Sequence, residues 1–379
     1  MMKVKFTAAL HDSSGYSEAS RNYLCALDTL VKKEKIELCA TSPKFEMWHT
    51  DVGPTYRPII EKYCAKTFEP DLHIIHLTPD CYLKNIKPGQ KTVAYAAWET
   101  SKLPEKWLEP LNAADEIWVP SDYNVEVFKS SGVTKPVYAV PHAISVPDLL
   151  ARAEGQQAEF NIPKDKFIFY SIYQWTPRKN PEGLLKAFFS EFTTKDPVCL
   201  VVKSYVKSYG AGERDFIRSE IQRIRKSMHI DDAPPVVFIG SDLSSQQIAQ
   251  LHQAGDCMVF PTRAEGFSLT AFEAMAFGKP VITTNYSGHL AFMNEQNSYL
   301  TDYQLTPCAG MPWPLYTGRM SWAEPNLDHL KKQMRHVFEN RDDAAAKGRQ
   351  AAEDVNRFSW DNVGKIMIDR METLVGGAK

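Results

Sequence analysis

The sequence lacks the features that mark several large classes of protein. No apolar run approaches the ~18 residues of a membrane-spanning helix, and the apolar stretch within the first ten residues is too short for a signal peptide. The formal net charge is only −2, so no global field attracts nucleic acid or an acidic membrane. We therefore expect a cytoplasmic protein, and peripheral contact with a membrane through one face stays open.

Patterns that would hold a metal, a disulfide or a dinucleotide are also missing. The seven cysteines are scattered and form no Cys-x-x-Cys pair, which favours free thiols in a reducing compartment. There is no Asp-x-Asp run, no Walker loop and no Gly-x-Gly-x-x-Gly. His73 and His76 have no third ligand at metal spacing. The sequence therefore predicts a site with neither metal nor tightly bound cofactor.

What is present is an alternation of short β-type runs with amphipathic helical stretches, which predicts parallel α/β sheets. Strands are expected in the first half at 4–7, 36–40, 72–77, 92–98, 117–119 and 137–140, and in the second half at 167–170, 199–202, 236–239, 257–260 and 281–284. Residues 144–165 lose this pattern and are expected to form a linker. The predicted divisions are 1–150, 151–358 and a last helix over 359–379 with Ser359 as its N-cap.

The most informative stretch is FPTRAEGFSLTAFEAMAFGKPVITT, residues 260–284. A buried strand is expected to end at Phe260, and a helix to begin near Leu269 after Ser268 at the N-cap position. The free amides of that first turn form a ready site for a phosphate. Glu265 before the helix and Glu273 within it flank the site, and each carboxylate can accept two hydrogen bonds from vicinal sugar hydroxyls.

Two further loops follow predicted strands. Arg178 and Lys179 lie in SIYQWTPRKNPEGLLKAF, where cations at a strand end suit a diphosphate leaving group. Lys203 is expected to end the next strand, and whether it reaches a ligand is left open. Gly15 follows the first strand and would let the backbone approach a ligand closely, with an ordinary turn as the alternative.

Glu265 and Glu273 have the Glu-x7-Glu spacing of the retaining GT-B glycosyltransferases, and EGFSLTAFEAMAFGKPVI resembles the signature of glycosyltransferase family 4, the glycosyl transferases group 1. This resemblance implies two Rossmann-like domains that face each other across a cleft, with the C-terminal helix returning to the first. It implies a retaining, metal-independent hexosyltransferase that uses a UDP- or GDP-linked sugar. The implied acceptor is a hydroxyl of a glycan or glycolipid.

The resemblance also implies roles for individual residues. The implied catalytic residues are Glu265 at the donor sugar, Lys179 at the diphosphate, and Glu99, which stands where many members carry a His. The position of the family's Arg is Gln174 here, and whether Arg178 takes its place is left open. The other implied donor-binding residues are Gly15, Lys203, Gly240, Leu243, Gly266, Phe267, Ser268, Leu269 and the ribose-binding Glu273, and residues 285–289 are expected to shape the sugar pocket. His76, Glu99 and His142 are assigned to the acceptor side, with a structural role left open for both histidines.

Two other interpretations stay open. A nucleic-acid-modifying glycosyltransferase could share the fold, but the near-neutral charge counts against it, since strand binding needs clustered cations. An inactive nucleotide-sugar-binding module is supported only by Gln174. Residues 310–322, with the composition GMPWPLYTGRMSW, match neither pattern.

Overall fold

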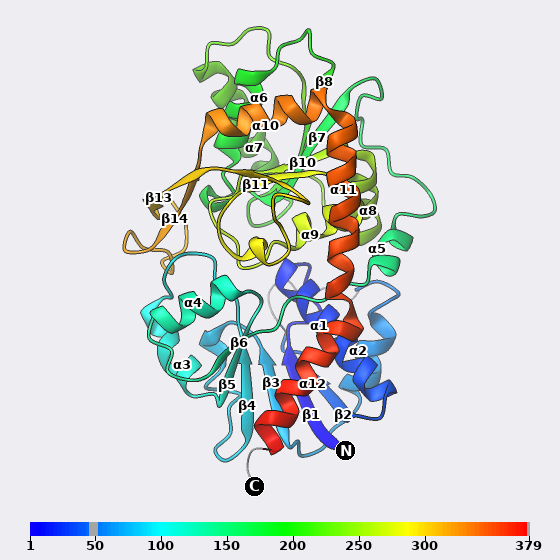
Figure 1. The fold of residues 1–379 in the computed structure, drawn as a ribbon, viewed down its shortest axis with the longest axis vertical. Coiled ribbons are helices and arrows are strands. Elements are labelled where there is room, and N and C mark those ends of the chain that lie inside the picture. The colour runs from blue at the N-terminus through cyan, green and yellow to red at the C-terminus, as the bar shows by residue number, and fades with distance from the viewer. Residues whose placement is uncertain (45–51, 377–379) are drawn as a thin grey trace. The chain divides into compact units, whose positions relative to one another are not determined.

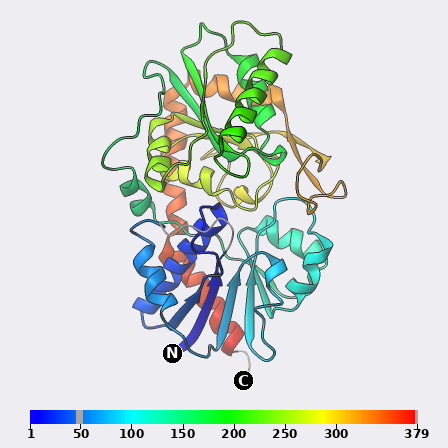
Figure 2. The same cartoon turned by 180° about the vertical axis from the view of Figure 1, so that it is seen from behind.

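The computed structural model describes residues 1–44 and 52–376 and divides the chain into two compact units. Unit 1 comprises Met1–Asp148 and Asn356–Lys379, and unit 2 comprises Leu149–Val355. Residues 377–379 of the last predicted segment lie outside the described residues. Each unit is built on a six-stranded parallel sheet with helices packed on it (Figures 1 and 2), which confirms the predicted α/β class.

The sheet of unit 1 has the order β2-β1-β3-β4-β5-β6. Its strands are β1 (Met2–Ala8), β2 (Ile36–Thr41), β3 (Leu72–His76), β4 (Lys91–Tyr95), β5 (Glu116–Val119) and β6 (Val137–Ala139), and its helices include α1 (Gly15–Lys32), α2 (Arg57–Cys64), α3 (Leu108–Asn112) and α4 (Asp122–Ser130). Phe6, Ile74 and Val93 are fully buried, as expected for strands covered on both faces. Strand β4 ends before the predicted limit, so Glu99 lies in the loop that follows.

The last helix, α12 (Trp360–Gly376), belongs to unit 1 and packs against α1. Ser359 caps it, because the Ser359 hydroxyl accepts a hydrogen bond from the amide of Asn362 (3.3 Å). The Trp360 indole donates to the side chain of Asn22 (2.8 Å) on α1. Arg370 forms a two-pronged ion pair with the buried Glu116 of β5. The chain thus crosses to unit 2 and returns, and its last helix completes the first unit.

The sheet of unit 2 has the order β12-β11-β10-β7-β8-β9. Its strands are β7 (Phe167–Gln174), β8 (Val198–Tyr205), β9 (Val236–Ile239), β10 (Cys257–Phe260), β11 (Val281–Thr284) and β12 (Tyr299–Thr301), and its helices are α6 (Pro181–Glu191), α7 (Ala211–Ser227), α8 (Ser245–Ala254), α9 (Leu269–Ala276), α10 (Leu327–Glu339) and α11 (Arg341–Val355). The first strand, β7, lies between β8 and β10, so the strand order reverses between β7 and β10. Open α/β sheets bind ligands at such a switch point.

Three predictions for the region from residue 144 to residue 205 also differ from the structure. Strands β7 and β8 extend past Tyr170 and Val202, because polar residues continue the ladder: the Ser204 hydroxyl donates to the carbonyl of Tyr173 (2.8 Å). Lys203 therefore lies inside β8 and does not end it. The predicted linker contains a helix, α5 (Val146–Arg152), which buries Leu149 and begins after Ser145, whose hydroxyl accepts from the Asp148 amide.

An antiparallel hairpin, β13 (Tyr303–Pro307) and β14 (Ser321–Pro325), carries the segment that matched no sequence pattern. It extends from the body of unit 2 (Figures 1 and 2). Its base is joined to the loop after β10, since the Ala323 amide donates to the carbonyl of Arg263 and the Arg263 guanidinium pairs with Glu324 (2.6 Å). The hairpin is thus anchored two residues from Glu265.

Candidate functional site

The loops after β7 and β10 are bonded to each other at the switch point of unit 2. Asn180 has a left-handed backbone (φ 55°) and caps α6, accepting from the amide of Gly183, while its side-chain amide donates to the carbonyl of Pro261 (3.1 Å). The Arg263 amide donates to the carbonyl of Arg178 (2.7 Å). These bonds place the Arg178–Lys179 loop beside the loop that carries Glu265.

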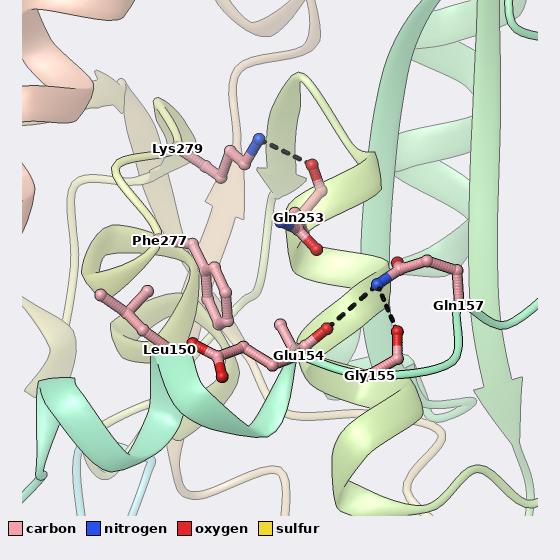
Figure 3. A pocket seen from close by; sticks show the side chains of 8 residues that line it. Leu150, Glu154, Gly155, Gln157, Gln253, Phe277 and Lys279 are labelled. Carbon is pink, nitrogen blue, oxygen red and sulfur yellow. Dashed lines mark hydrogen bonds between the residues drawn. The ribbon is translucent and has the colours of Figure 1, made fainter.

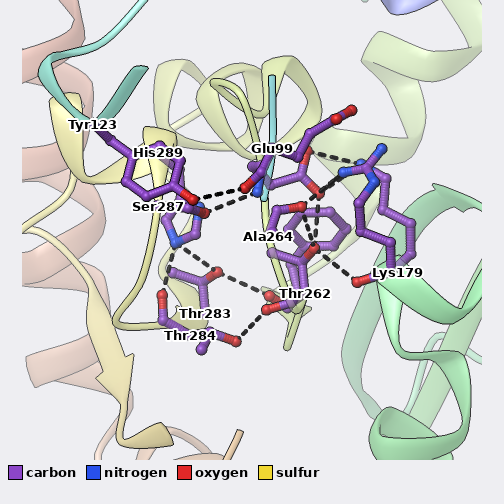
Figure 4. A network of polar contacts seen from close by, with 12 residues as sticks. Glu99, Tyr123, Lys179, Thr262, Ala264, Thr283, Thr284, Ser287 and His289 are labelled. Atoms are coloured by element: carbon purple, nitrogen blue, oxygen red, sulfur yellow. Dashed lines mark hydrogen bonds and ion pairs between the residues drawn. The ribbon is translucent and has the colours of Figure 1, made fainter. Parts of the chain in front are cut away.

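Glu265 lies at the centre of a buried ionic cluster. Figure 4 shows Lys179 and Thr262 within the same network of polar contacts. Lys179 Nζ is 2.7 Å from Glu265 Oε1 and 2.9 Å from Oε2, and Arg178 Nη1 is 3.0 Å from Oε1. The Thr262 hydroxyl also donates to Oε1 (2.8 Å). Burial alone would raise the pKa of Glu265, but the charges of Lys179 and Arg178 outweigh it and lower that pKa to about 2. The carboxylate is therefore ionised at neutral pH.

Gln174 and Arg178 make different contacts at this edge of the sheet. The Gln174 side-chain amide donates to the carbonyl of Val206 (2.6 Å), which holds it along the edge of β7 and β8. Arg178 instead donates to both the carbonyl of Ala264 (2.7 Å) and the Glu265 carboxylate. The second cation at this site is thus Arg178.

A third loop, after β11, holds the backbone of Glu265. The Glu265 amide donates to the Ser287 hydroxyl (2.8 Å), and the Gly288 amide donates to the carbonyl of Glu265 (2.8 Å). A Cβ atom at Gly288 would lie 1.9 Å from the carbonyl oxygen of Gly266, so only glycine allows this approach. His289 is fully buried beside them, with Nε2 2.7 Å from the carbonyl oxygen of Thr284. The sequence predicts that residues 285–289 shape the sugar pocket, but it does not predict these bonds to Glu265.

Ser287 has a strained backbone, and its effect on stability can be measured. Its φ of 81° and ψ of −159° fall in a region almost restricted to glycine, at a cost of about 1–3 kcal/mol. Ser287→Ala and Ser287→Gly both lose the hydroxyl that accepts from Glu265, but only glycine removes the strain. We expect Ser287→Ala to have a free energy of unfolding about 1–3 kcal/mol below that of Ser287→Gly, measured by urea denaturation. Equal values for the two variants would contradict this account.

The amino-terminal end of α9 is the place where the sequence predicts an anion site. Ser268 occupies the N-cap position with φ 78°, but its side chain makes no capping bond. Its hydroxyl oxygen is buried and has no hydrogen-bond partner among the residues that the structure describes. Phe267, packed against Phe272 and Phe292, fixes the start of the helix. The first-turn amides and the Ser268 hydroxyl can therefore bind a phosphate.

Glu273 lies on α9 next to a buried histidine that sequence reasoning missed. Glu273 Oε2 is 3.5 Å from Nε2 of His252 on α8, and His252 Nδ1 is 3.0 Å from the hydroxyl of Tyr170 on β7. His252 is fully buried and stacks on Phe277. The Glu273 carboxylate thus lies beside a histidine that is bonded to the sheet through Tyr170. Nothing in the local pattern of α8 distinguishes His252 from a core residue.

The other predicted donor residues lie at several places. Gly240 and Leu243 follow β9, and Gly266 and Leu269 flank Ser268. Gly15 is the first residue of α1, where the Ser14 side chain caps the helix by accepting from the amide of Ser17. That arrangement is the ordinary turn and N-cap that the sequence left as the alternative for Gly15.

The residues predicted on the acceptor side belong to unit 1. The ring of His76, the last residue of β3, is buried, stacks on Tyr16 (4.2 Å between centroids) and bonds the Ser20 hydroxyl. His142 is buried and bonds the hydroxyl of Tyr23, and burial lowers the pKa of His142 to about 3. Both environments favour the structural role left open for the two histidines. Glu99 is half-buried, and its carbonyl accepts from the Tyr123 hydroxyl (3.0 Å).

A cavity of about 550 Å3 in unit 2 lies apart from this site. Leu150, Phe277, Gln157 and Lys279 are among its lining residues (Figure 3), and Lys279 precedes β11, at the opposite end of that strand from the candidate site.

Within residues 1–44 and 52–376, no three His, Cys, Asp or Glu side chains are grouped to hold a metal ion. In the same residues no helix is both long and apolar enough to cross a membrane.

Two Rossmann-like units, each built on a six-stranded parallel sheet, define the GT-B class of fold. Solved structures with this fold agree along the chain. Sucrose-phosphate synthase from Thermosynechococcus elongatus is 16% identical with a TM-score of 0.69 and covers 100% of both chains. Anabaena Alr3699/HepE in complex with UDP-glucose is 14% identical with a TM-score of 0.63, covering 98% of this chain and 100% of that one. At these identities the likeness shows the fold alone.

Residues 153–302 match the family model described as glycosyl transferases group 1. Among curated proteins, the D-inositol 3-phosphate glycosyltransferase of Corynebacterium urealyticum is 26% identical over 129 residues, 34% of this chain and 26% of that protein. The Segniliparus rotundus protein of the same name is 22% identical over 224 residues, 59% of this chain and 43% of that one. The alignments thus span less than half the length of these relatives.

Proposed function

We propose that this protein is a retaining, metal-independent hexosyltransferase that transfers a sugar from a UDP- or GDP-linked donor to a hydroxyl group. The observation that carries this proposal is the cluster of Glu265, Lys179 and Arg178 beside the amino-terminal end of α9, at the switch point of unit 2. The match of residues 153–302 to the glycosyl transferases group 1 supports it, as do the titles of similarly folded structures that name UDP and UDP-glucose.

In this proposal each part of the donor meets a chemically matched group. The diphosphate lies against the first-turn amides of α9 and the Ser268 hydroxyl, with Lys179 as counter-ion. The Glu273 carboxylate accepts from the ribose hydroxyls and the Glu265 carboxylate from the sugar. The base lies near the loop 240–243. The acceptor, a glycan or glycolipid, is assigned to the side of unit 1 that carries Glu99, and the free cysteines support a cytoplasmic setting.

Catalysis in this proposal depends mainly on stabilising the leaving group. As the bond from the anomeric carbon to the phosphate oxygen breaks, charge grows on the diphosphate, and Lys179, Arg178 and the α9 amino terminus offset it. The acceptor oxygen bonds to the same face of the anomeric carbon, and its proton passes to the departing phosphate oxygen. Glu265 is ionised and paired with two cations, which favours a role in positioning the sugar over one as nucleophile.

Binding of UDP, GDP, ADP and dTDP, measured by calorimetry, tests the proposal. We expect UDP or GDP to bind, and Glu273→Ala to weaken that binding about 10- to 100-fold, because charge-assisted hydrogen bonds to the ribose are lost. Glu220→Ala removes a glutamate that pairs with Arg223 on the surface of α7 and should leave affinity unchanged. Slow hydrolysis of the donor would exclude an inactive binding module. If the protein bound none of the four nucleotides, the proposal would be overturned.

A further inference from the structure

Lys203 is a buried cation near the carboxyl edge of the unit 2 sheet. Lys203 as a whole residue is 3% exposed, and its Nζ lies 4.4 Å from the ring centroid of Tyr209. No hydrogen bond or ion pair involves this ammonium group among the residues that the structure describes. Burial lowers the pKa of Lys203 to about 8, and Asp242 partly opposes the shift. Because an unpaired buried charge is costly, such a group is a candidate for ligand binding.

The sheet register shows on which face Lys203 lies. Lys203 is directly opposite Ile172 of β7 and Ile239 of β9, and side chains paired in this way point to the same face. Tyr170, two residues before Ile172, shares that face and bonds His252 of α8. Lys203 therefore projects on the α8 side of the sheet, where His252 contacts the proposed ribose-binding Glu273.

The strand order places Lys203 at one end of the proposed donor site. The phosphate-binding end of α9 follows β10, whereas Lys203 lies two strands away on β8, opposite the last residue of β9. Gly240 and Asp242 follow directly in the chain. Since phosphate, ribose and base are linked in that order, a donor held by α9 and Glu273 would direct its base toward β8 and β9.

We propose that Lys203 selects donors with a keto base, an inference that rests on the proposed function. A lysine ammonium has three hydrogen-bond donors and no acceptor. It can donate to O4 of uracil or O6 of guanine. Cytosine and adenine carry an amino group at the corresponding positions. This amino group and the Lys203 ammonium both donate hydrogen bonds, so neither could pair with the other.

Two pairs of ligands and one pair of variants test this inference. Calorimetry would compare UDP with CDP, and GDP with ADP, on the wild-type protein, on Lys203→Met and on Lys279→Met. Methionine keeps an unbranched chain and removes the charge. Lys279 is a matched control, since it is a half-buried lysine of the same unit whose ammonium donates to the carbonyl of Gln253, away from the site. The wild-type protein should prefer the keto base of at least one pair about tenfold or more.

Lys203→Met should reduce the preference for the keto base to less than about threefold, because its affinity for the keto nucleotide falls. Lys279→Met should keep the wild-type preference. A wild-type protein that binds nucleotides without keto preference would overturn the inference and leave the proposed function standing. A keto preference that survives in a folded Lys203→Met variant would also overturn the inference and leave the proposed function standing. Binding of none of the four nucleotides would instead overturn the proposed function, and the inference with it. If Lys203→Met does not fold, the wild-type comparison decides alone.

Discussion

Replacing Lys179 with methionine is expected to lower the turnover number of sugar transfer by about 10²–10³-fold, with little change in the Michaelis constant of the donor. Lys179 is the cation assigned to the departing diphosphate, whose charge is larger in the transition state than in the bound donor. An interaction that strengthens in this way contributes to turnover more than to ground-state binding. Steady-state kinetics with the donor identified by calorimetry would measure both constants.

The variant should fold, because Glu265 keeps its ion pair with Arg178 and its bond from Thr262. Lys186→Met is the matched control: Lys186 lies on the helix that follows, α6, and pairs with Glu182 at the surface. Its turnover should equal that of the wild-type protein. A Lys179→Met enzyme that turns over normally, or one that loses only donor affinity, would refute the leaving-group role.

The positions of Glu265 and Lys179 in the candidate site could be predicted from the sequence because each follows a buried strand. Glu265 comes after β10 and Lys179 after β7, and both strands have the apolar runs of a parallel sheet. Their contact could not be predicted locally. It depends on β7 and β10 being neighbours, and strand order is decided by packing across the whole unit.

The supporting residues escaped prediction for a different reason. Ser287 and His252 act through a backbone conformation and a buried contact that no residue spacing encodes. Lys203 was misplaced because a charged residue normally marks the end of a buried strand, whereas here the hydrogen-bond ladder with β7 continues to Tyr205. Departures from local rules are expected at functional sites. Ser287 bonds Glu265 and His252 contacts Glu273, the two carboxylates of the candidate site.

The free energy of unfolding should fall in acid as Glu265 becomes protonated. Comparison with one substitution, Glu265→Gln, would measure this contribution. The pKa of Glu265 is about 2 in the folded protein against an ordinary value of 4.5. An acid whose pKa is lowered on folding contributes stability above pH 4.5, and that contribution is lost as pH falls toward 2. The difference corresponds to about 3 kcal/mol at neutral pH.

Glu265→Gln is therefore expected to lower the free energy of unfolding by about 3 kcal/mol at pH 7, because glutamine cannot balance the charges of Lys179 and Arg178. The gap between the two proteins should narrow as pH falls below 4.5, since protonated Glu265 is also neutral. Urea denaturation at pH 7 and pH 3.5 would measure it. Glu182→Gln removes an exposed partner of Lys186 and should cost under about 1 kcal/mol. A gap of constant size at both pH values would mean that Glu265 is not held ionised by its two cations.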